Sequence, residues 1–256
     1  MSTLVDILAM QSTDQDVFVT GVFDSARPHI FGGQLLAQVL MAACKTVPTE
    51  RVPHSLHAYF VAAGDSSKPV EIQVTRERDG RTFSARKMTV VQEGRLLMNA
   101  LSSFQTPETG IEAQSETFPR TPAPGDSYEL YPHPVCSDIQ IVDTAPELQL
   151  AHPARSWSRV LPELKGDNFL QACAMTYVSD FYTGLVQFSE FPKDAMLTSI
   201  DHAIWFYRPF NLNNWHLMDW HGHSISSGRG HYSGNFYDDA GRMVASASQE
   251  MVVRHG

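Results

Sequence analysis

The sequence contains few basic residues and no long apolar run. Lysine and arginine total 19 among 256 residues, against 28 aspartates and glutamates, which gives a formal net charge of −9. A chain of this charge has no basic field with which to bind nucleic acid or an anionic membrane surface. The longest strictly apolar run, Val39–Cys44, is far shorter than the roughly 20 residues of a membrane-spanning helix. The N-terminus also lacks the charged-then-apolar pattern of a signal peptide, so a soluble, cytoplasmic protein without a membrane partner is predicted.

Cysteine is also scarce. The three cysteines, Cys44, Cys136 and Cys173, are odd in number and none belongs to a CxxC pair. This pattern predicts neither a disulfide framework nor a cysteine-based zinc site. We therefore interpret all three as buried thiols.

The hydrophobic content is that of an ordinary globular protein, at 43%. The length suits one large domain or two domains of about 120 residues each. One segment differs from the rest, because residues 106–153 hold eight of the fifteen prolines and eight acids against a single base, Arg120. A proline-rich, acidic segment with little periodicity indicates a linker on the surface. We therefore divide the chain into a domain at 1–105, a linker at 106–153 and a domain at 154–256.

The first domain is predicted to contain one helix followed by four strands. Apolar residues recur at i, i+1, i+4, i+5 and i+8 from Leu35, which is typical of a helix buried along one face. Alternating and β-branched residues predict strands at 55–61, 69–78, 82–92 and 95–105. The dipeptides Asp79-Gly80 and Glu93-Gly94 are expected to form the tight turns between them.

The second domain repeats this plan. Apolar residues recur with a 3.6-residue period from Leu170 to Leu185, so a long buried helix is predicted there. Strands are expected at 197–207, 215–226, 231–237 and 242–254, with a hairpin turn at 238–241.

The two domains can be aligned with each other in order. Gln34 aligns with Gln171 at an offset of 137, Ser55 with Ser199 at 144, and Gly94 with Gly241 at 147. Such ordered self-similarity indicates an internal duplication. Each copy is then an α+β unit, in which an antiparallel sheet of four or five strands wraps round one long helix and buries it.

Five motifs carry a resemblance to a known family. They are FGGQLLAQ at 31–38, DGRTFS at 79–84, YVSDF at 177–181, TSIDHAIWFYRPF at 198–210 and VASASQE at 244–250. In this order they resemble the acyl-CoA thioesterase II family, over nearly the whole chain outside the linker. The resemblance implies a double hotdog fold, with two antiparallel sheets, each wrapped round a long central helix, joined into one continuous sheet. It also implies hydrolysis of fatty acyl-CoA to the free acid and CoA.

The resemblance further implies an active site made of an aspartate on the second central helix, a hydroxyl residue two before the Asp-His pair and a glutamine near the C-terminus. These positions are Asp180, Ser199 and Gln249. Ser199 stands where threonine is commoner in the family, which keeps the hydroxyl group. Residues 61–64, Val-Ala-Ala-Gly, replace the Leu-Arg-Pro-Gly that the family often shows. The first domain therefore lacks that arginine for contacts with substrate or CoA.

The same residues suit the chemistry. Hydrolysis of a thioester by water needs a group that orients the water and a donor that stabilises the developing oxyanion. Asp180 is expected on the flank where helix meets sheet, and a carboxylate there is costly unless it is hydrogen-bonded or functional. By strand alternation, Ser199 is expected on the face of Ala203 and Trp205, and Gln249 on the face of Ala247. The aligned residues of the first domain are Ala43, Ser55 and Ser102, so a single active site, in the second domain, is predicted.

Other residues are weaker candidates. His57 could line a cavity, although a strand histidine is more often structural. The cluster His216, His221, His223 and His231 matches no zinc spacing, so no metal is predicted. No GxSxG elbow or phosphate-binding glycine loop occurs, and we predict no cofactor.

Three functions remain open from the sequence. The first is an acyl-CoA thioesterase, the second a non-catalytic acyl-CoA binding protein, and the third an enoyl-CoA hydratase-like enzyme on a hotdog scaffold. Retention of all three polar positions favours the thioesterase, because a binding protein needs no buried carboxylate near the thioester. Because sheet edges are usually covered by association, we also expect a homodimer or a higher homo-oligomer.

Overall fold

The computed structural model describes residues 3–23, 28–124, 139–145, 148, 150, 152–161, 164, 168–191 and 195–254. Cys44 and Cys173 are buried, as predicted, whereas Cys136 lies outside the described residues. Within these ranges, no helix is long and apolar enough to cross a membrane.

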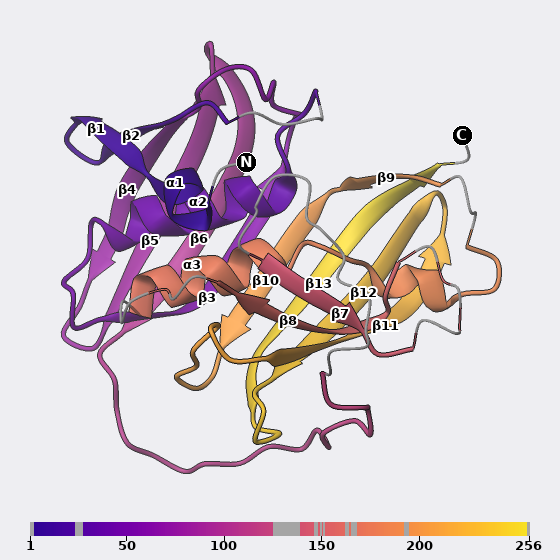
Figure 1. Ribbon diagram of the computed structural model, residues 1–256. Coiled ribbons are helices and arrows are strands. Elements are labelled where there is room, and N and C mark those ends of the chain that lie inside the picture. The colour runs from indigo at the N-terminus through magenta and orange to yellow at the C-terminus, as the bar shows by residue number, and fades with distance from the viewer. Residues whose placement is uncertain are drawn as a thin grey trace.

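The strands form one antiparallel sheet that runs through both halves of the molecule (Figure 1). Its order is β1 (Met10–Asp14), β2 (Val17–Thr20), β4 (Glu71–Asp79), β5 (Phe83–Gln92), β6 (Arg95–Gln105), β3 (Val52–Phe60), β10 (Asp201–Phe206), β13 (Met243–Arg254), β12 (Arg229–Tyr237), β11 (His216–Ser226), β8 (Arg155–Val160) and β7 (Ile139–Asp143). A further strand, β9 (Met196–Ser199), pairs with the end of β13. The halves join where β3 pairs with β10, from Tyr59 opposite Asp201 to Ser55 opposite Trp205. The predicted continuous sheet is therefore confirmed.

Two long helices lie side by side on one face of this sheet (Figure 1). They are α2 (Gly32–Cys44) and α3 (Asn168–Val178), and the short helix α1 (Leu4–Leu8) packs against both. Their apolar side chains and those of the inner sheet face form one core that spans both halves. The first turn of α2 approaches the end of α3 so closely that a Cβ on Gly33 would lie 2.5 Å from the Tyr177 carbonyl oxygen. Only glycine permits this approach, and it brings the start of one helix to the end of the other.

Helix α3 ends at Val178, seven residues before the predicted end at Leu185. The Ser179 hydroxyl hydrogen-bonds back to the Thr176 carbonyl at 2.8 Å, and the Phe181 N–H bonds to Val178 O three residues back. The chain then enters the 3₁₀ helix η2 (Gly184–Gln187), which Thr183 caps. Leu185 is thus buried in a separate element. The apolar periodicity of the sequence extends beyond the end of the helix.

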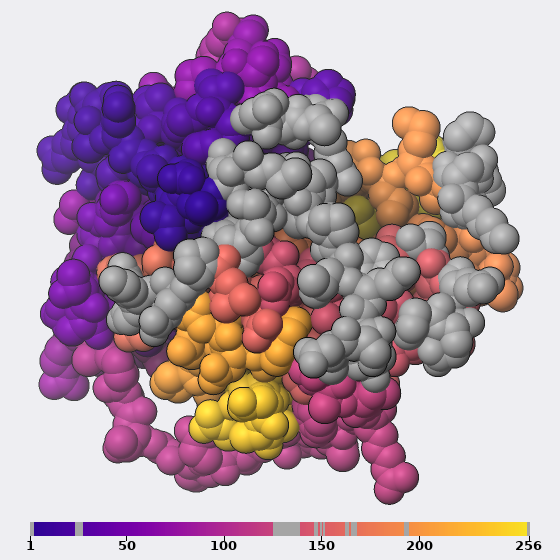
Figure 2. All heavy atoms as spheres, in the orientation of Figure 1, coloured from indigo at the N-terminus to yellow at the C-terminus, as the bar shows by residue number. Residues whose placement is uncertain are grey.

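Part of the segment interpreted as a linker belongs to the sheet. Strand β7 lies within 106–153, pairs with β8, and buries Ile139, Ile141 and Val142 because they are apolar. Residues 107–117 are exposed, and Gln114 bonds to Gly241 O at 3.2 Å and to the N–H of Met243 at 2.8 Å. This magenta stretch runs beside the yellow C-terminal hairpin (Figure 2). The domain limits at 105/106 and 153/154 remain a prediction.

Candidate active site

A β-bulge shapes the strand that carries Ser199. Ser199 pairs with Met251 and Ala203 pairs with Ser248, so the three residues 200–202 face only two residues of β13. An extra residue in one strand turns the following side chains to the opposite face of the sheet. Ser199 and His202 therefore both reach the interior, whereas Trp205 faces outward and packs edge-on against His57. The expectation that Ser199 shares a face with Ala203 and Trp205 is wrong for this reason.

Gln249 lies at the centre of the polar cluster beneath this bulge. Its Nε2 donates to Ser199 Oγ at 2.7 Å and also to the Asp180 carboxylate. Its Oε1 contacts Nδ1 of His202. The structure thus brings Asp180, Ser199 and Gln249 together, from the end of α3, from β9 and from β13. Their catalytic roles stay a prediction.

The Asp180 carboxylate is the most unusual group of the cluster. Its side chain is 5% exposed, and this burial raises its pKa from 3.8 to about 6, against the opposing effect of hydrogen bonds from Gln249 and from the Gly33 N–H. Among the described side chains, no lysine or arginine forms an ion pair with it. A Cβ on Gly32 would lie 2.5 Å from its Oδ2. The first half of the chain therefore contributes to the cluster through the N-terminus of α2.

His202 completes the cluster. Neither this histidine nor the Gly33 N–H was predicted from the sequence as part of the site. Its Nε2 lies 2.9 Å from Ser179 Oγ, and its Nδ1 lies 4.0 Å from Asp180 Oδ1. Burial lowers the pKa of His202 to about 4, so the ring is neutral at pH 7. One signal was available, because the alignment of the two halves places Ala58 opposite His202. Like the aspartate and the glutamine, this histidine occurs only in the second half.

The other histidines considered in the sequence lie outside the cluster. His57 is on the exposed side of the sheet, against Trp205. The four histidines that cluster in the sequence bond to separate partners: His216 to Asn214 O, His221 to Asp219, His223 to Ser233 and His231 to Ser248. In the described part of the chain, no group of three or more histidine, cysteine or acidic side chains is arranged to hold a metal ion.

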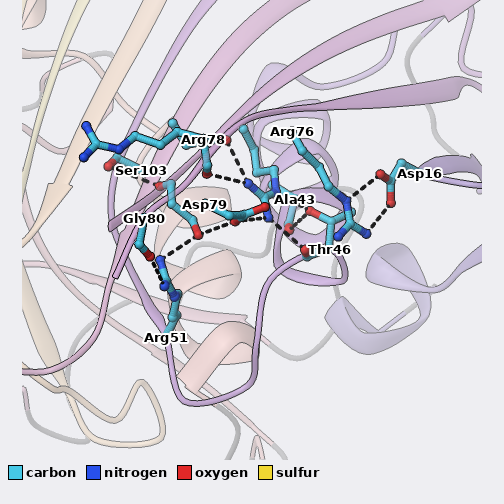
Figure 3. A network of polar contacts seen from close by, with 12 residues as sticks. Asp16, Ala43, Thr46, Arg51, Arg76, Arg78, Asp79, Gly80 and Ser103 are labelled. Carbon is cyan, nitrogen blue, oxygen red and sulfur yellow. Dashed lines mark hydrogen bonds and ion pairs between the residues drawn. The ribbon is translucent and has the colours of Figure 1, made fainter. Parts of the chain in front are cut away.

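A second buried polar cluster lies in the first half (Figure 3). The Arg86 side chain, 1% exposed, donates to Asp79 Oδ1 at 2.7 Å and to the hydroxyl and carbonyl oxygens of Thr46 at 2.8 and 3.0 Å. Arg51 donates to Ser84 Oγ at 2.7 Å, and Ser84 in turn donates to Asp79 at 2.6 Å. The bond from Ser84, followed by the bond and charge of Arg86, lowers the pKa of Asp79. This cluster ties the end of α2 to the β4–β5 hairpin, and its carboxylate is neutralised by a cation.

Comparisons with known proteins cover the whole chain. The family model described as the acyl-CoA thioesterase N-terminal domain matches residues 19–105, and that of the C-terminal domain matches residues 113–253. The sequence is 31% identical over 281 residues to acyl-CoA thioesterase 2 of Haemophilus influenzae, an alignment that covers 99% of this chain and 98% of that protein.

Solved structures give the same result. An acyl-CoA thioesterase II, TesB2, from Mycobacterium marinum superposes with a TM-score of 0.85 at 28% identity, covering 99% of this chain and 97% of that one. A protein from Alicyclobacillus acidocaldarius with a hot dog fold superposes with a TM-score of 0.80 at 18% identity, covering 100% and 99% of the two chains. The second likeness shows the fold alone. It confirms the predicted hotdog fold, whereas the wrapping of each sheet round its helix stays a prediction.

Proposed function

The chain belongs to the acyl-CoA thioesterase family, and from this premise we propose that it hydrolyses fatty acyl-CoA through a water molecule held by Asp180, Ser199 and Gln249. One observation carries the assignment of these residues. The buried Asp180 carboxylate, with its pKa raised to about 6, has an amide and a backbone N–H as hydrogen-bond donors but no paired lysine or arginine among the described side chains. Strongly shifted, unneutralised carboxylates of this kind are concentrated at functional sites.

In the first step, ionised Asp180 accepts a proton from the water while the water oxygen bonds to the thioester carbonyl carbon. A base with a pKa of about 6 is largely ionised at neutral pH and still strong enough to accept the proton. Ser199 Oγ orients the water toward the carbonyl, and the Gln249 amide, 2.7 Å from that oxygen, holds the hydroxyl in place. Holding the reacting groups in this way removes much of the entropic barrier.

Negative charge then develops on the carbonyl oxygen. The N-terminus of α2 lies beside Asp180, because the Gly33 N–H bonds to that carboxylate. Backbone N–H groups and the dipole of a helix N-terminus stabilise anions, and we assign the oxyanion to this place. When the C–S bond breaks, the CoA thiolate takes the proton held by Asp180. The products are the free acid and CoA.

The proposal includes the assembly of the protein. Apolar side chains are exposed where the two halves of the sheet meet, among them Tyr59 at 63% and Leu101 at 54%. A second copy of the chain would cover such a face, as a homodimer or a higher homo-oligomer. We further propose that each half of the sheet curves round its own helix. Light scattering at micromolar concentration should give at least twice the chain mass of 28.5 kDa, and a fully active monomer would contradict the assembly.

A thiol-release assay on a panel of acyl-CoAs tests the function. Only hydrolysis frees CoA, so a hydratase-like enzyme or a binding protein gives no thiol signal. We expect release by the parent protein and its loss in Asp180→Asn. A folded parent that binds acyl-CoA without freeing thiol would contradict the proposal.

A further inference from the structure

His202 is a buried polar side chain that the catalytic scheme does not yet use. It lies on β10, it is 1% exposed, and both of its ring nitrogens contact side chains. Nδ1 contacts Gln249 Oε1, and Nε2 lies 2.9 Å from Ser179 Oγ. The β10–β13 register, continued by one residue from Ala203 and Ser248, places His202 directly opposite Gln249. The imidazole therefore contacts the oxygen side of the Gln249 amide.

The hydrogen-bond pattern determines which ring nitrogen carries the proton. Gln249 Nε2 donates to Ser199 Oγ and to the Asp180 carboxylate, so both N–H bonds of the amide serve the active site. The remaining amide atom, Oε1, only accepts, and its partner Nδ1 must therefore donate. In a neutral ring Nε2 is then unprotonated and can only accept. The single hydroxyl proton of Ser179 is therefore shared between Nε2, at 2.9 Å, and the Thr176 carbonyl, at 2.8 Å.

We propose that His202 is a positioning residue, an inference that rests on the proposed function: its Nδ1–H holds Gln249 Oε1 and so keeps the amide N–H bonds on Ser199 and Asp180. If the amide turned by 180°, Oε1 would face the Asp180 carboxylate and the two acceptors would repel each other. Asp180 would also lose the Gln249 hydrogen bond that lowers its pKa. Removal of Nδ1–H therefore weakens the orientation of the water and makes Asp180 harder to ionise.

Among the residues that the structure describes, no other charged group faces this contact in a way that could replace the imidazole. Asp180 Oδ1 lies 4.0 Å from Nδ1, and on β12 the buried Tyr232 pairs with Gln249 and has a raised pKa, because burial disfavours its ionised form. Asp201 on β10 accepts the Glu250 N–H at 2.7 Å. The first half has Ala58 at the aligned position, where it is buried as well. The duplicated fold thus forms without an imidazole there, and the histidine is specific to the half with the cluster.

The tautomer can be observed directly. In protein labelled with ¹⁵N-histidine, the His202 ring signals are identified by their absence from His202→Asn. We expect a neutral ring with the proton on Nδ1 throughout the pH range in which the enzyme is active. A proton on Nε2 alone, or a doubly protonated ring, would overturn the proposal whatever the activity of any variant.

A matched pair of variants tests the effect on catalysis. Asparagine at 202 places its amide near the position of Nδ1, whereas glutamine is one bond longer and extends toward Ser179. We expect His202→Asn to keep kcat within about tenfold of the parent. His202→Gln should lower kcat by about 100-fold with KM nearly unchanged, as for other displaced catalytic groups. It should also move the acid limb of the pH profile to higher pH, which a loss of stability alone does not do. Equal kcat in the two variants, with the parental acid limb, contradicts the positioning role.

Asp180→Asn, assayed alongside, separates this inference from the proposed function. If that variant keeps the parental kcat, the active-site assignment fails and the positioning role fails with it. If it is inactive while His202→Gln keeps the parental kcat and acid limb, only the positioning role fails. Should His202→Gln not fold, the ¹⁵N signals of the parent still decide the matter.

Discussion

The first half of the molecule buries Arg86 against Asp79, whereas the second half buries Asp180 against Gln249 and a neutral histidine. In the first cluster the pKa of the carboxylate is lowered by Ser84 and Arg86. In the second, burial raises the pKa of Asp180 to about 6. The two clusters belong to duplicated halves that share one sheet and one core.

We interpret the first cluster as structural and propose that the second is catalytic. A paired carboxylate holds β4, β5 and the end of α2 together and stays ionised at neutral pH. A buried carboxylate without a cation is held in a costly state, and such carboxylates are concentrated at functional sites. In the proposed assignment, the two halves share one scaffold plan and the chemistry is concentrated in the second half.

The largest expected effect is the loss of activity in Asp180→Asn. The amide cannot accept the proton from water, so kcat should fall by about 10²–10⁴ with the fold retained. Asp79→Asn is the matched change in the first half, and it should leave kcat within about threefold because Asp79 contacts Arg86 and Ser84. Thiol release under saturating acyl-CoA measures both. Equal losses in the two variants would remove the contrast between the clusters.

Smaller losses are expected from the groups that orient the water. Ser199→Ala and Gln249→Ala should each lower kcat by about 10- to 100-fold, and the double variant should lose less than the two losses combined, because the groups act as a unit. Ser102→Ala is the control, since Ser102 aligns with Gln249 and its hydroxyl donates to the Ser55 carbonyl at 2.9 Å, away from the cluster. Parental kinetics in Gln249→Ala would exclude it from the site.

A third prediction concerns stability. A pKa raised from 3.8 to about 6 in the folded protein stabilises the fold below about pH 4, and this contribution is lost as the pH rises through 6. The ionised carboxylate then costs up to roughly 3 kcal/mol at pH 8. Asp180→Asn should therefore be more stable than the parent at pH 8, with the gain absent near pH 4. Denaturant unfolding at both pH values measures this. If the variant is less stable than the parent at pH 8, the ionised Asp180 carboxylate does not destabilise the fold.

The smallest effect, of opposite sign, is expected from Asp79→Asn. The lowered pKa of Asp79 stabilises the fold above its usual pKa, and that contribution is lost as the pH falls through the lowered value. Because Asp79 is half-exposed, its replacement should cost only about 1–2 kcal/mol at pH 8, and less in acid. The same unfolding measurements test it. A stabilising Asp79→Asn would show that the first cluster is strained too.

Periodicity predicted the elements well where pairing is local. The strand at 95–105 has the predicted ends. The strand predicted at 197–207 is divided into β9 and β10, and each of the other predicted strands ends within three residues of its expected limits. The pattern failed where tertiary structure intervenes. Phe181 and Leu185 continue the apolar period of α3 although the helix ends at Val178, and the bulge near Ile200 turns Ala203 to the opposite face from Ser199. Strand β7 was not predicted because it is short and lies in a proline-rich segment. It forms because Ile139, Ile141 and Val142 are buried where β7 pairs with β8.

The site was predicted from motifs more than from physical chemistry. Asp180, Ser199 and Gln249 are individually weak signals, because aspartates near helix ends and polar strand residues are mostly structural. His202 and the Gly33 N–H were not predicted from the sequence, since the position of His202 depends on the register after a bulge and that of the Gly33 N–H on the approach of α2 to α3. The alignment of His202 with Ala58 was the sequence feature that pointed to the histidine.

The pH dependence of kcat/KM for acyl-CoA hydrolysis tests the central claim most directly, because it reports the ionisation of the essential base in the free enzyme. We expect activity to rise with pH through an apparent pKa of about 6, the value for Asp180, in both the parent and Asp79→Asn. The residual activity of Asp180→Asn should lack this limb. An acid limb near pH 6 that survives in Asp180→Asn would show that another group is the base and would contradict the account.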